Sequence, residues 1–484
     1  MNKAPKRNRP TNPRSRSNDQ RGRSNNKPDR TNDKPRDRDA LNAANRDANR
    51  LRQASELWQQ WLGETQWHQL DRWLKHTLGK NKKYGKRDRL FYGDCLFNAA
   101  RFSYFATVVI ELYKSEAHIN SELTLPPSLA IKEATGLKAL LARISQSKLG
   151  PQTFELSQWR AKGEQALPES LQIFEPIITR INEMRASSMG FALIWHSIPV
   201  DYAPQFEALG KVLPSKEALD TFIAQQDHRP PLWLRLNHEE TRNTVLAELN
   251  EHYQVTVEGN AIAIEGNRGV FGLECFKNGD IEIQDWASQQ LAAKVAVTKG
   301  QKVWDACAGG GGKTLAIASR MNNHGALWAT DIREYKLQEV KRRAKQAGFF
   351  NIRTAPWNGE DALQLPKEIN RDGGFDWVLV DGPCSSSGTW RRNPDAKLRH
   401  LGQDLKSLTE LQLQLLENAA KAVKPGGRLV YGTCSIFNEE NFQIIEQFKA
   451  SNSDWEVEYA ELLGCPSKDS DSLFAAVLRA PSEK

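Results

Sequence analysis

From Gln301 to the C-terminal end of the chain, short apolar runs alternate with stretches whose apolar residues have helical spacing. The runs that we predict to be strands are residues 303–306, 326–330, 352–355, 377–380, 428–431, 455–459 and 474–478. Strands that alternate with helices in this way form parallel sheets with helices on both faces. We therefore predict a doubly wound, mostly parallel α/β sheet in residues 294–484.

The preceding region has a helical pattern. In residues 41–225, apolar side chains recur every three or four positions, as they do between Leu51 and Leu78. The basic segment Gly79–Arg89 connects two of these stretches and is either a contact for RNA phosphates or a solvated loop. We predict a helical accessory domain in residues 41–225.

A short region of mixed pattern follows the break at Pro230-Pro231. Strand-like runs surround one helical segment, Thr241–Tyr253, and an Asn278-Gly279 pair predicts a hairpin turn within residues 272–284. We predict a small α+β domain in residues 230–293.

The basic charge of the chain is concentrated at its beginning. The net charge of the 484 residues is +8, but residues 1–50 alone contain 15 Lys and Arg against 6 Asp. Residues 1–40 contain almost no apolar side chains, so burial cannot offset the entropy that ordering costs, and we predict a disordered tail. Two roles remain open for this tail: an arm that binds nucleic-acid phosphates, or a segment that keeps the protein in solution.

Membrane insertion, secretion and structural zinc are not indicated. No run of about 18 apolar residues occurs, and the beginning of the chain lacks the apolar segment of a secretory signal. The six cysteines form no Cys-x-x-Cys pair, which argues against a metal site. Sparse free thiols are typical of a reducing compartment, so we expect a cytoplasmic protein.

A glycine-rich loop follows the first predicted strand of the sheet. The sequence runs Asp305-Ala-Cys-Ala-Gly-Gly-Gly-Gly-Lys-Thr314, and a helical stretch comes next. Glycines let a ligand approach the backbone, and the start of a helix favours negative groups. Asp331 ends the next strand, at a spacing that suits a ribose diol. The sequence therefore predicts a nucleoside cofactor at this loop.

Three alternatives exist for this loop. The segment Gly312-Lys-Thr314, with Asp381 as a magnesium ligand, is similar to a P-loop nucleotidase, but that motif requires glycine at the position of Cys307. A cofactor with a ribose and no triphosphate, such as S-adenosylmethionine, agrees better with Asp331. A glycine-rich turn that binds nothing is the third alternative.

Two cysteines follow two predicted strands of the sheet. Cys384 ends the run Trp377-Val-Leu-Val-Asp-Gly-Pro-Cys384, and Cys434 ends Arg428-Leu-Val-Tyr-Gly-Thr-Cys434. Their separation of 50 residues accommodates one strand–helix–strand crossover. If the two strands are neighbours, both thiols lie at the ligand-binding edge.

A methyl donor beside two thiols indicates a particular reaction. Carbon 5 of a pyrimidine is a poor nucleophile until a thiolate adds to carbon 6, so an activated cysteine solves this problem. Asp381 is placed to bond the edge of the base. Cys307 is expected to line the cofactor site, and Cys95, Cys275 and Cys465 are expected to be small buried side chains without a reactive role.

These motifs together resemble the Sun/Fmu family of RNA cytosine-5 methyltransferases, particularly its bacterial small-subunit rRNA members. The segments that carry the resemblance are Pro230-Pro-Leu-Trp-Leu-Arg-Leu-Asn237, Gln284-Asp-Trp-Ala-Ser288, the glycine loop, Asp381-Gly-Pro-Cys-Ser-Ser-Ser-Gly388, Thr389-Trp-Arg-Arg-Asn-Pro-Asp395, Tyr431-Gly-Thr-Cys-Ser435 and Phe474-Ala-Ala-Val-Leu-Arg479. The resemblance implies a class I S-adenosylmethionine-dependent fold, a NusB-like helical domain and an RRM-like domain in residues 230–293.

The resemblance also implies roles for individual residues. Cys434, in the Thr-Cys pair, is implied to be the nucleophile, and Cys384, in the Pro-Cys pair, to help release the product. The cofactor residues carried over are Cys307, Ala308, Gly309, Gly310, Gly311, Gly312, Lys313, Asp331, Asn358 and Asp381. Asn358 stands where the family has an acid, and Gly309-Gly310 stand where it has Ala-Pro, so we expect a more flexible loop and weaker cofactor binding.

The expected partner is structured RNA, with rRNA favoured and tRNA as a second choice, and the protein is expected to act as a monomer. Two other classes of function stay open at this point. A P-loop NTPase would bind ATP and magnesium, and a non-catalytic RNA-binding assembly factor would need neither thiol.

Overall fold

The computed structural model of the protein describes residues 35–64, 68–115, 134–163, 166–265, 269–402 and 404–482. Its contacts divide the chain into a small unit, residues 1–49, and a compact unit, residues 50–484. The domain boundaries predicted above therefore stay predictions, because residues 50–484 form one unit by this measure.

The predicted disordered tail is partly wrong. Helix α1 runs from Pro35 to Gly63, so it begins inside the segment predicted to be disordered. Proline is well suited to the first turn of a helix, and Ala43 and Ala44 have the highest helical propensity. Residues 1–34 of the predicted tail lie outside the described residues.

The region predicted to be helical is helical. After α1 come α2 (Leu70–Lys80), α3 (Lys86–Lys114), α4 (Ala134–Gln146), α5 (Gly150–Lys162), α6 (Glu175–Met184), α7 (Met189–Trp195), α8 (Ala203–Val212) and α9 (Lys216–Gln225). Within the described residues, α3 alone is long and apolar enough to cross a membrane, with a mean hydropathy of 1.2 over 18 residues. Because 83% of that window is buried inside the protein, we assign α3 as a core helix.

A four-stranded antiparallel sheet follows, in the order β2-β3-β1-β4. Its elements are β1 (Leu232–Leu236), α10 (Arg242–Asn250), β2 (Val255–Glu258), β3 (Ala261–Ile264), α11 (Glu274–Lys277) and β4 (Ile281–Ile283). The strands confirm an α+β unit, whereas its likeness to an RRM domain stays a prediction.

The hairpin expected around Asn278-Gly279 is wrong. A short helix, α11, occupies residues 274–277. The reason is a cap that sequence spacing does not show: the carboxylate of Glu248 accepts hydrogen bonds from the backbone N–H groups of Glu274 (2.7 Å) and Cys275 (2.9 Å). Asn278-Gly279 then ends this helix before β4.

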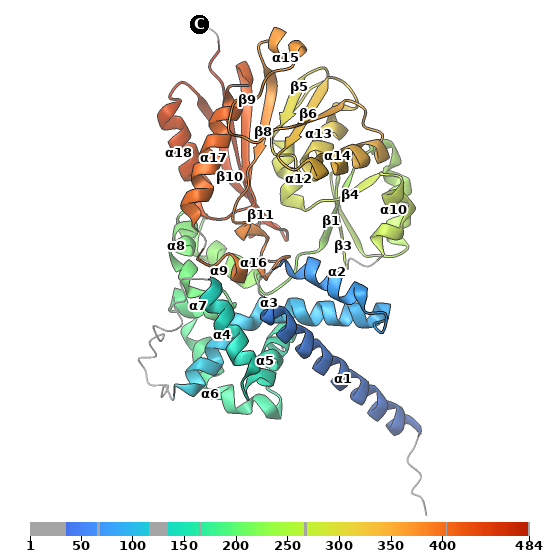
Figure 1. The fold of residues 1–484 in the computed structure, drawn as a ribbon, viewed down its shortest axis with the longest axis vertical. Coiled ribbons are helices and arrows are strands. Elements are labelled where there is room, and N and C mark those ends of the chain that lie inside the picture. The colour runs from blue at the N-terminus through green and yellow to red at the C-terminus, as the bar shows by residue number, and fades with distance from the viewer. Residues whose placement is uncertain are drawn as a thin grey trace, which may run out of the picture. The chain divides into compact units, whose positions relative to one another are not determined.

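The C-terminal region forms a seven-stranded sheet in the order β10-β11-β9-β8-β5-β6-β7 (Figure 1). The strands are β5 (Lys302–Asp305), β6 (Ala326–Asp331), β7 (Ile352–Pro356), β8 (Phe375–Asp381), β9 (Val423–Thr433), β10 (Glu456–Gly464) and β11 (Ser472–Arg479). Strands β5 to β9 pair in parallel, and β11 pairs antiparallel with both β9 and β10. The predicted doubly wound, mostly parallel sheet is confirmed.

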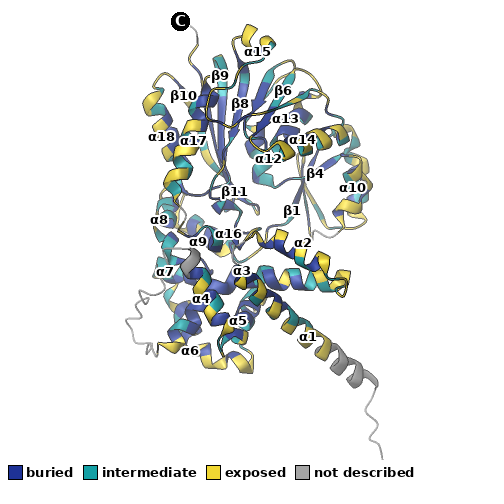
Figure 2. Cartoon of the chain, in the orientation of Figure 1, coloured by how far each residue is buried: buried dark blue, intermediate teal, exposed yellow. Residues whose placement is uncertain are grey.

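Helices cover both faces of this sheet. They are α12 (Trp286–Ala293), α13 (Gly312–Met321), α14 (Glu334–Gln346), α15 (Lys367–Arg371), α17 (Leu405–Ala420) and α18 (Phe442–Ser451). Alternate strand residues point to opposite layers. Val378 and Tyr431 belong to the cluster with α17 and α18, whereas Leu379 and Val430 belong to the cluster with α12 and α13. Figure 2 shows these strands as the buried centre of the region.

The helical region and the sheet region share one hydrophobic core. Trp390 and Phe437, from loops beside the sheet, belong to the same buried cluster as the helices α3 to α9. The ring of Tyr202 lies 4.9 Å from that of Trp390 and 5.6 Å from that of Phe437. Because these loops follow Cys384 and Cys434, the helical region supports the backbone of both thiols.

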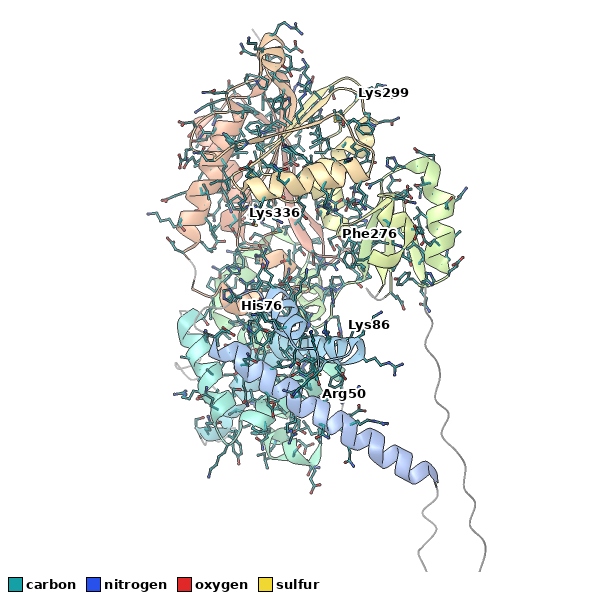
Figure 3. All side chains as sticks on the ribbon, turned by 45° about the vertical axis from the view of Figure 1, so that its right-hand side comes forward. Arg50, His76, Lys86, Phe276, Lys299 and Lys336 are labelled. Carbon is teal, nitrogen blue, oxygen red and sulfur yellow. The ribbon has the colours of Figure 1, made fainter. Side chains whose placement is uncertain are left out.

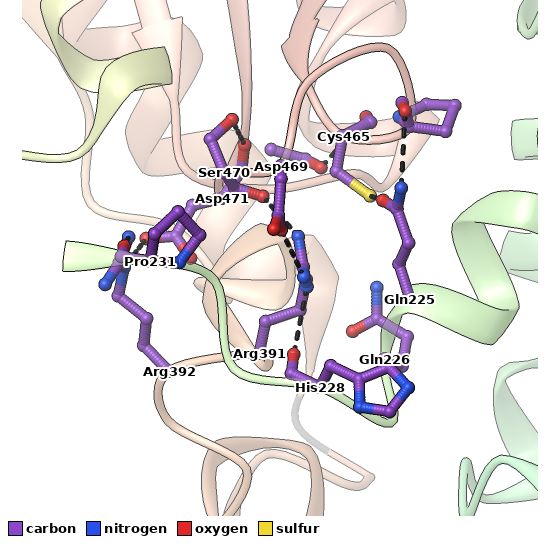
Figure 4. Close-up of polar contacts among 12 residues, drawn as sticks. Gln225, Gln226, His228, Pro231, Arg391, Arg392, Cys465, Asp469, Ser470 and Asp471 are labelled. Carbon is purple, nitrogen blue, oxygen red and sulfur yellow. Dashed lines mark hydrogen bonds and ion pairs between the residues drawn. The ribbon is translucent and has the colours of Figure 1, made fainter. Parts of the chain in front are cut away.

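Buried cations reinforce this junction. Arg391 donates to the carbonyl of His228 (3.1 Å) and to Asp469 (2.6 Å), as Figure 4 shows. Arg101 of α3 donates to the carbonyl of Arg391 (2.7 Å), and Lys397 donates to the carbonyl of Arg101 (2.7 Å). Burial lowers the pKa of the Lys397 ammonium. The segment after Cys384 is thus fixed to α3 at two points.

Candidate active site

A cavity of about 910 Å³ lies at the carboxyl ends of the parallel strands. This edge of an open α/β sheet binds ligands, at the point where the strand order reverses between β5 and its two neighbours. Predicted site residues that line the cavity are Cys307, Ala308, Gly309, Gly310, Gly312, Lys313, Asp331, Asn358, Asp381, Cys384 and Cys434. The structure therefore brings together nearly all of the residues that the sequence analysis selected.

The glycine loop has a defined conformation. Gly309 and Gly311 have φ angles of +53° and +89°, a region that other residues rarely adopt. A side chain at Gly309 would meet nothing within 4 Å, so this residue faces open space. Gly311 instead packs against Val340 and is absent from the cavity lining. The backbone N–H of Gly311 donates a hydrogen bond to the carbonyl of Ala308 (2.9 Å), which closes the turn.

Asp331 is anchored beside the loop. Its carboxylate accepts hydrogen bonds from the backbone N–H of Gly309 (2.9 Å) and from the side chain of Arg333 (2.9 Å). Burial acts to raise the pKa of Asp331, but the bonds from Arg333 and Gly309 outweigh it and lower the pKa. Asp331 is therefore a fixed carboxylate at the end of β6, where a ribose diol would be bound.

Lys313 is placed by another carboxylate. Its Nζ lies 2.6 Å from Asp381 Oδ2, and both groups line the cavity. Burial opposes the charge on Lys313, but Asp381 raises the pKa of the lysine. This ion pair connects the start of α13 to the end of β8.

The two thiols meet at the cavity wall. Cys384 follows β8 and Cys434 follows β9, which are neighbouring parallel strands, and their Sγ atoms are 3.3 Å apart. Both cysteines are free and half-buried. The strand-edge location predicted from their spacing is confirmed.

The thiols have unequal environments. The hydrogen bond from Cys384 lowers the pKa of Cys434, as do Ser386 and Lys313, against the effects of burial and Asp381. The same shared hydrogen bond, together with burial, raises the pKa of Cys384. The favoured ionic form of the pair is thus a Cys434 thiolate that accepts a hydrogen bond from the Cys384 thiol.

A close backbone approach fixes the spacing of the two loops. The N–H of Gly388 donates to the carbonyl of Cys434 (2.9 Å). A side chain at Gly388 would lie 1.9 Å from the carbonyl oxygen of Ser472. Glycine at this position therefore lets the loop after Cys384 pack directly on the Cys434 strand end.

Asn358 lies at the cavity rim with a carboxylate beside it. Its side-chain amide donates to Glu360 (2.8 Å), and its oxygen accepts from the backbone N–H of Glu360 (3.1 Å). Glu360 also lines the cavity. Glu360 was not among the predicted site residues, although an acid only two positions after Asn358 could have indicated it.

Other lining residues were also missed. They are Ser288, Asp305, Ala306, Ile332, Arg333, Trp357, Gly382, Pro383, Ser386, Leu411, Gln414 and Leu415. Seven of these residues end or directly follow β5, β6 or β8, beside the residues that were predicted. Leu411, Gln414 and Leu415 of α17 and Trp357 after β7 line the cavity only because the fold brings them there. Cys95, Cys275 and Cys465 are buried away from the cavity, as predicted.

The structure disfavours a P-loop nucleotidase. The hydroxyl of Thr314, which would have to face magnesium, is buried and donates to Asp305 (2.6 Å). Asp305, Asp331 and Asp381 all line the cavity, so a triphosphate would meet three carboxyl groups. The cations that line the cavity, Lys313 and Arg333, are paired with Asp381 and Asp331, so neither is placed to bind a triphosphate.

Comparison with known proteins agrees with this site. Residues 292–474 match the family model described as 16S rRNA methyltransferase RsmB/F. These residues are similar to the methyltransferase domain of the Sun/Fmu family. The chain is 31% identical over 271 residues to ribosomal RNA small subunit methyltransferase B of Pasteurella multocida, which covers 54% of this chain and 59% of that protein. It is 35% identical over 187 residues to a probable ribosomal RNA small subunit methyltransferase B of Bacillus subtilis. This alignment covers 39% of this chain and 41% of that protein.

The chain thus matches less than two thirds of the length of these relatives. The crystal structure of PH0851 aligns with 84% of this chain, and the alignment includes 93% of the PH0851 chain. The sequence identity is 21% and the TM-score is 0.60, which supports the same fold. The matched region has the fold of a class I methyltransferase domain, and the cofactor of such a domain is S-adenosylmethionine. The open space at Gly309 and the carboxyl groups around the cavity fit a cofactor with a ribose, an ammonium and a sulfonium.

Proposed function

We propose that the protein transfers a methyl group from S-adenosylmethionine to carbon 5 of a cytosine in structured RNA. The observation that carries this proposal is the pair of thiols, 3.3 Å apart, on the wall of the cavity that the glycine loop and Asp331 line. The names of the relatives favour rRNA, and tRNA is the second choice. The protein is proposed to act in the cytoplasm and as a monomer.

Cys434 is proposed as the nucleophile. Its thiolate adds to carbon 6 of the cytosine, and the electron pair moves toward carbon 5, which becomes nucleophilic. S-adenosylmethionine, when bound, supplies an electrophilic methyl group for carbon 5. A base then removes the proton from carbon 5, and the bond between Cys434 and carbon 6 breaks, which restores the ring and the thiolate.

Cys384 is proposed to assist this release. Its thiol lies next to the sulfur that must leave, and its raised pKa keeps it protonated while Cys434 is a thiolate. Asp381 and Lys313 line the same cavity as Cys434, and Asp381 is proposed to bond the edge of the base.

The cofactor is proposed to lie along the glycine loop. The loop residues Cys307–Lys313 would contact its methionine part, and Asp331 would bind the ribose. Asn358 and Glu360 together are proposed to take the place of the third acid that the family has, since they form one hydrogen-bonded pair at the rim. Burial raises the pKa of the Cys307 thiol, which supports a lining role and not a reactive one.

Several basic side chains outside the cavity are proposed to bind RNA phosphates. Lys82, Lys83, Lys86 and Arg87 of the basic connector are exposed, and Figure 3 locates Lys86 at the start of α3 and Lys336 on α14. The tail, of which residues 1–34 lie outside the described part of the chain, is proposed to add salt-sensitive affinity.

The proposal is tested by incubating the protein with methyl-labelled S-adenosylmethionine and total RNA from a strain that lacks it. We expect label on carbon 5 of cytosine in one RNA species. Absence of label with the wild-type protein, while RNA is still bound, would favour the non-catalytic assembly factor and contradict the proposal.

A further inference from the structure

A buried carboxylate outside the cavity lies behind the two thiols. Glu440, at the end of the short helix Asn438–Glu440, has no exposed surface. Burying a carboxylate is costly unless hydrogen-bond donors surround it. Its partners therefore indicate what this residue is positioned to do.

Three of the four hydrogen bonds to this carboxylate come from the two thiol loops. The backbone N–H of Ser385 (2.8 Å) and the side-chain amide of Gln412 (3.0 Å) donate to Oε1 of Glu440. The hydroxyls of Ser385 (2.5 Å) and Ser435 donate to Oε2. Ser385 follows Cys384, and Ser435 follows Cys434, so one carboxylate connects the residues that succeed the two thiols.

The surrounding hydroxyls close this network. Ser387 Oγ lies 2.9 Å from Ser435 Oγ and accepts a hydrogen bond from the N–H of Ile436 (3.0 Å). The Tyr431 hydroxyl donates to the backbone carbonyl of Glu440 (2.7 Å). Side chains from the two loops and from α17 therefore fix the carboxylate, and Tyr431 of β9 fixes the backbone of the same residue.

Different charged groups act on the two thiols. Lys313 and Asp381 act on Cys434, whereas the charge of Glu440 acts on Cys384 and raises the pKa of Cys384 further, after the shared hydrogen bond and burial. Tyr431 also faces Cys384, and burial raises the pKa of its hydroxyl, so it is uncharged. Glu440 is thus the buried anion on the Cys384 side.

We propose that Glu440 is a positioning residue that makes the two thiols unequal: its carboxylate fixes the Cys384 loop against the Cys434 loop and retains the proton of the pair on Cys384. Cys434 is then the sulfur that is free to attack. The consequence of this inference for catalysis rests on the proposed function. The position of the two thiols and the location of their proton do not depend on it.

Substitution with glutamine separates the charge from the network. In Glu440→Gln, the amide oxygen still accepts from Ser385 N–H and Gln412, and the NH₂ group donates to the two hydroxyls, which also act as acceptors. Glu440→Ala removes both charge and bonds. Glu439→Gln is the matched control, because it removes one charge from the adjacent residue, which accepts a hydrogen bond from Gln205 (3.4 Å).

The measurement is alkylation by iodoacetamide across pH, without RNA or cofactor, with Cys384 and Cys434 peptides quantified by mass spectrometry. We expect Cys434 to react first in the wild type and in Glu439→Gln. In Glu440→Gln, the ratio of Cys384 to Cys434 labelling should rise roughly tenfold, which corresponds to about one pKa unit. An unchanged ratio in Glu440→Gln would overturn the proposal, even if Glu440→Ala fails to fold.

Kinetics with RNA provide a second readout. We expect Glu440→Gln to lower kcat and to shift its pH profile while KM for RNA stays unchanged; a folded variant with the wild-type profile would contradict the inference. If the labelling ratio shifts but the wild-type protein methylates no RNA, the role of Glu440 stands and the proposed function fails.

Discussion

Lys313 Nζ and Asp381 Oδ2 are 2.6 Å apart, so an ion pair links the helix after the glycine loop to the strand end that precedes Cys384. The cofactor loop and the thiol site are therefore electrostatically coupled. This link has a consequence for the reactivity of Cys434, because Lys313 helps to lower the pKa of that thiol.

We expect Lys313→Met to make Cys434 less reactive. Without the ammonium, the thiolate faces Asp381 alone, so the pKa of Cys434 rises and its alkylation rate at neutral pH falls roughly tenfold. Lys341→Met, at an exposed position of α14, is the matched control. Equal alkylation rates in both variants would show that Lys313 does not support the thiolate.

Asp305 should make stability depend on pH. Burial raises the pKa of Asp305 from 3.8 to about 7, and one of its carboxyl oxygens has no hydrogen-bond partner. The folded protein thus keeps a proton that the unfolded chain releases near pH 4. The contribution of Asp305 to the free energy of unfolding is fully present below about pH 4 and is lost as the pH rises through 7.

Asp305→Asn removes this dependence, because an amide stays neutral and its oxygen still accepts from Thr314. Between pH 4 and pH 7, the wild type should lose stability relative to the variant, by on the order of 4 kcal/mol at most. Urea unfolding at several pH values measures this difference. The pKa of Asp471 is also raised to about 7, but Asp471 is present in both proteins. Its contribution therefore cancels in the difference between their stabilities. Parallel pH curves would refute the assignment.

Two glycine substitutions should lower stability for different reasons. Gly388→Ala places a carbon against the Ser472 carbonyl, and we expect a loss of about 1–3 kcal/mol in unfolding free energy. Gly309→Ala meets no atom within 4 Å, so its cost is the positive φ, about 1–2 kcal/mol.

Urea unfolding of both variants measures the two losses of stability. Wild-type stability in Gly388→Ala would contradict the close approach of this loop to the backbone of Ser472.

The sheet region should not be functional without the helical region. A fragment of residues 230–484 exposes Trp390 and Phe437, which are 3% and 2% exposed in the whole chain. We expect this fragment to aggregate, or to bind a hydrophobic dye, when it is analysed by size-exclusion chromatography and fluorescence. A monomeric fragment with wild-type methyl transfer would show that the shared core is dispensable.

The sequence predicted the sheet well for a physical reason. Buried parallel strands are continuous apolar runs between helices, so runs such as 326–330 and 377–380 lie within two residues of the ends of the strands β6 and β8. The glycine loop and both thiols were found because each directly follows such a run.

Contacts between distant residues could not be predicted in this way. Glu440 contacts Ser385 across 55 positions, and no local pattern indicates that pairing. The helix at residues 274–277 depends on the carboxylate of Glu248, 26 positions earlier. The helical pattern near Leu51 gave no indication that this region shares its core with the loop of Trp390.

The covalent step is the most direct test of the proposed function. In Cys384→Ala, attack by Cys434 stays possible but release is impaired, so incubation with S-adenosylmethionine and substrate RNA should accumulate a protein–RNA adduct. After nuclease and protease digestion, mass spectrometry should find a methylated cytosine attached to the peptide that contains Cys434. No adduct in Cys384→Ala, or an adduct on any residue other than Cys434, would contradict the central claim.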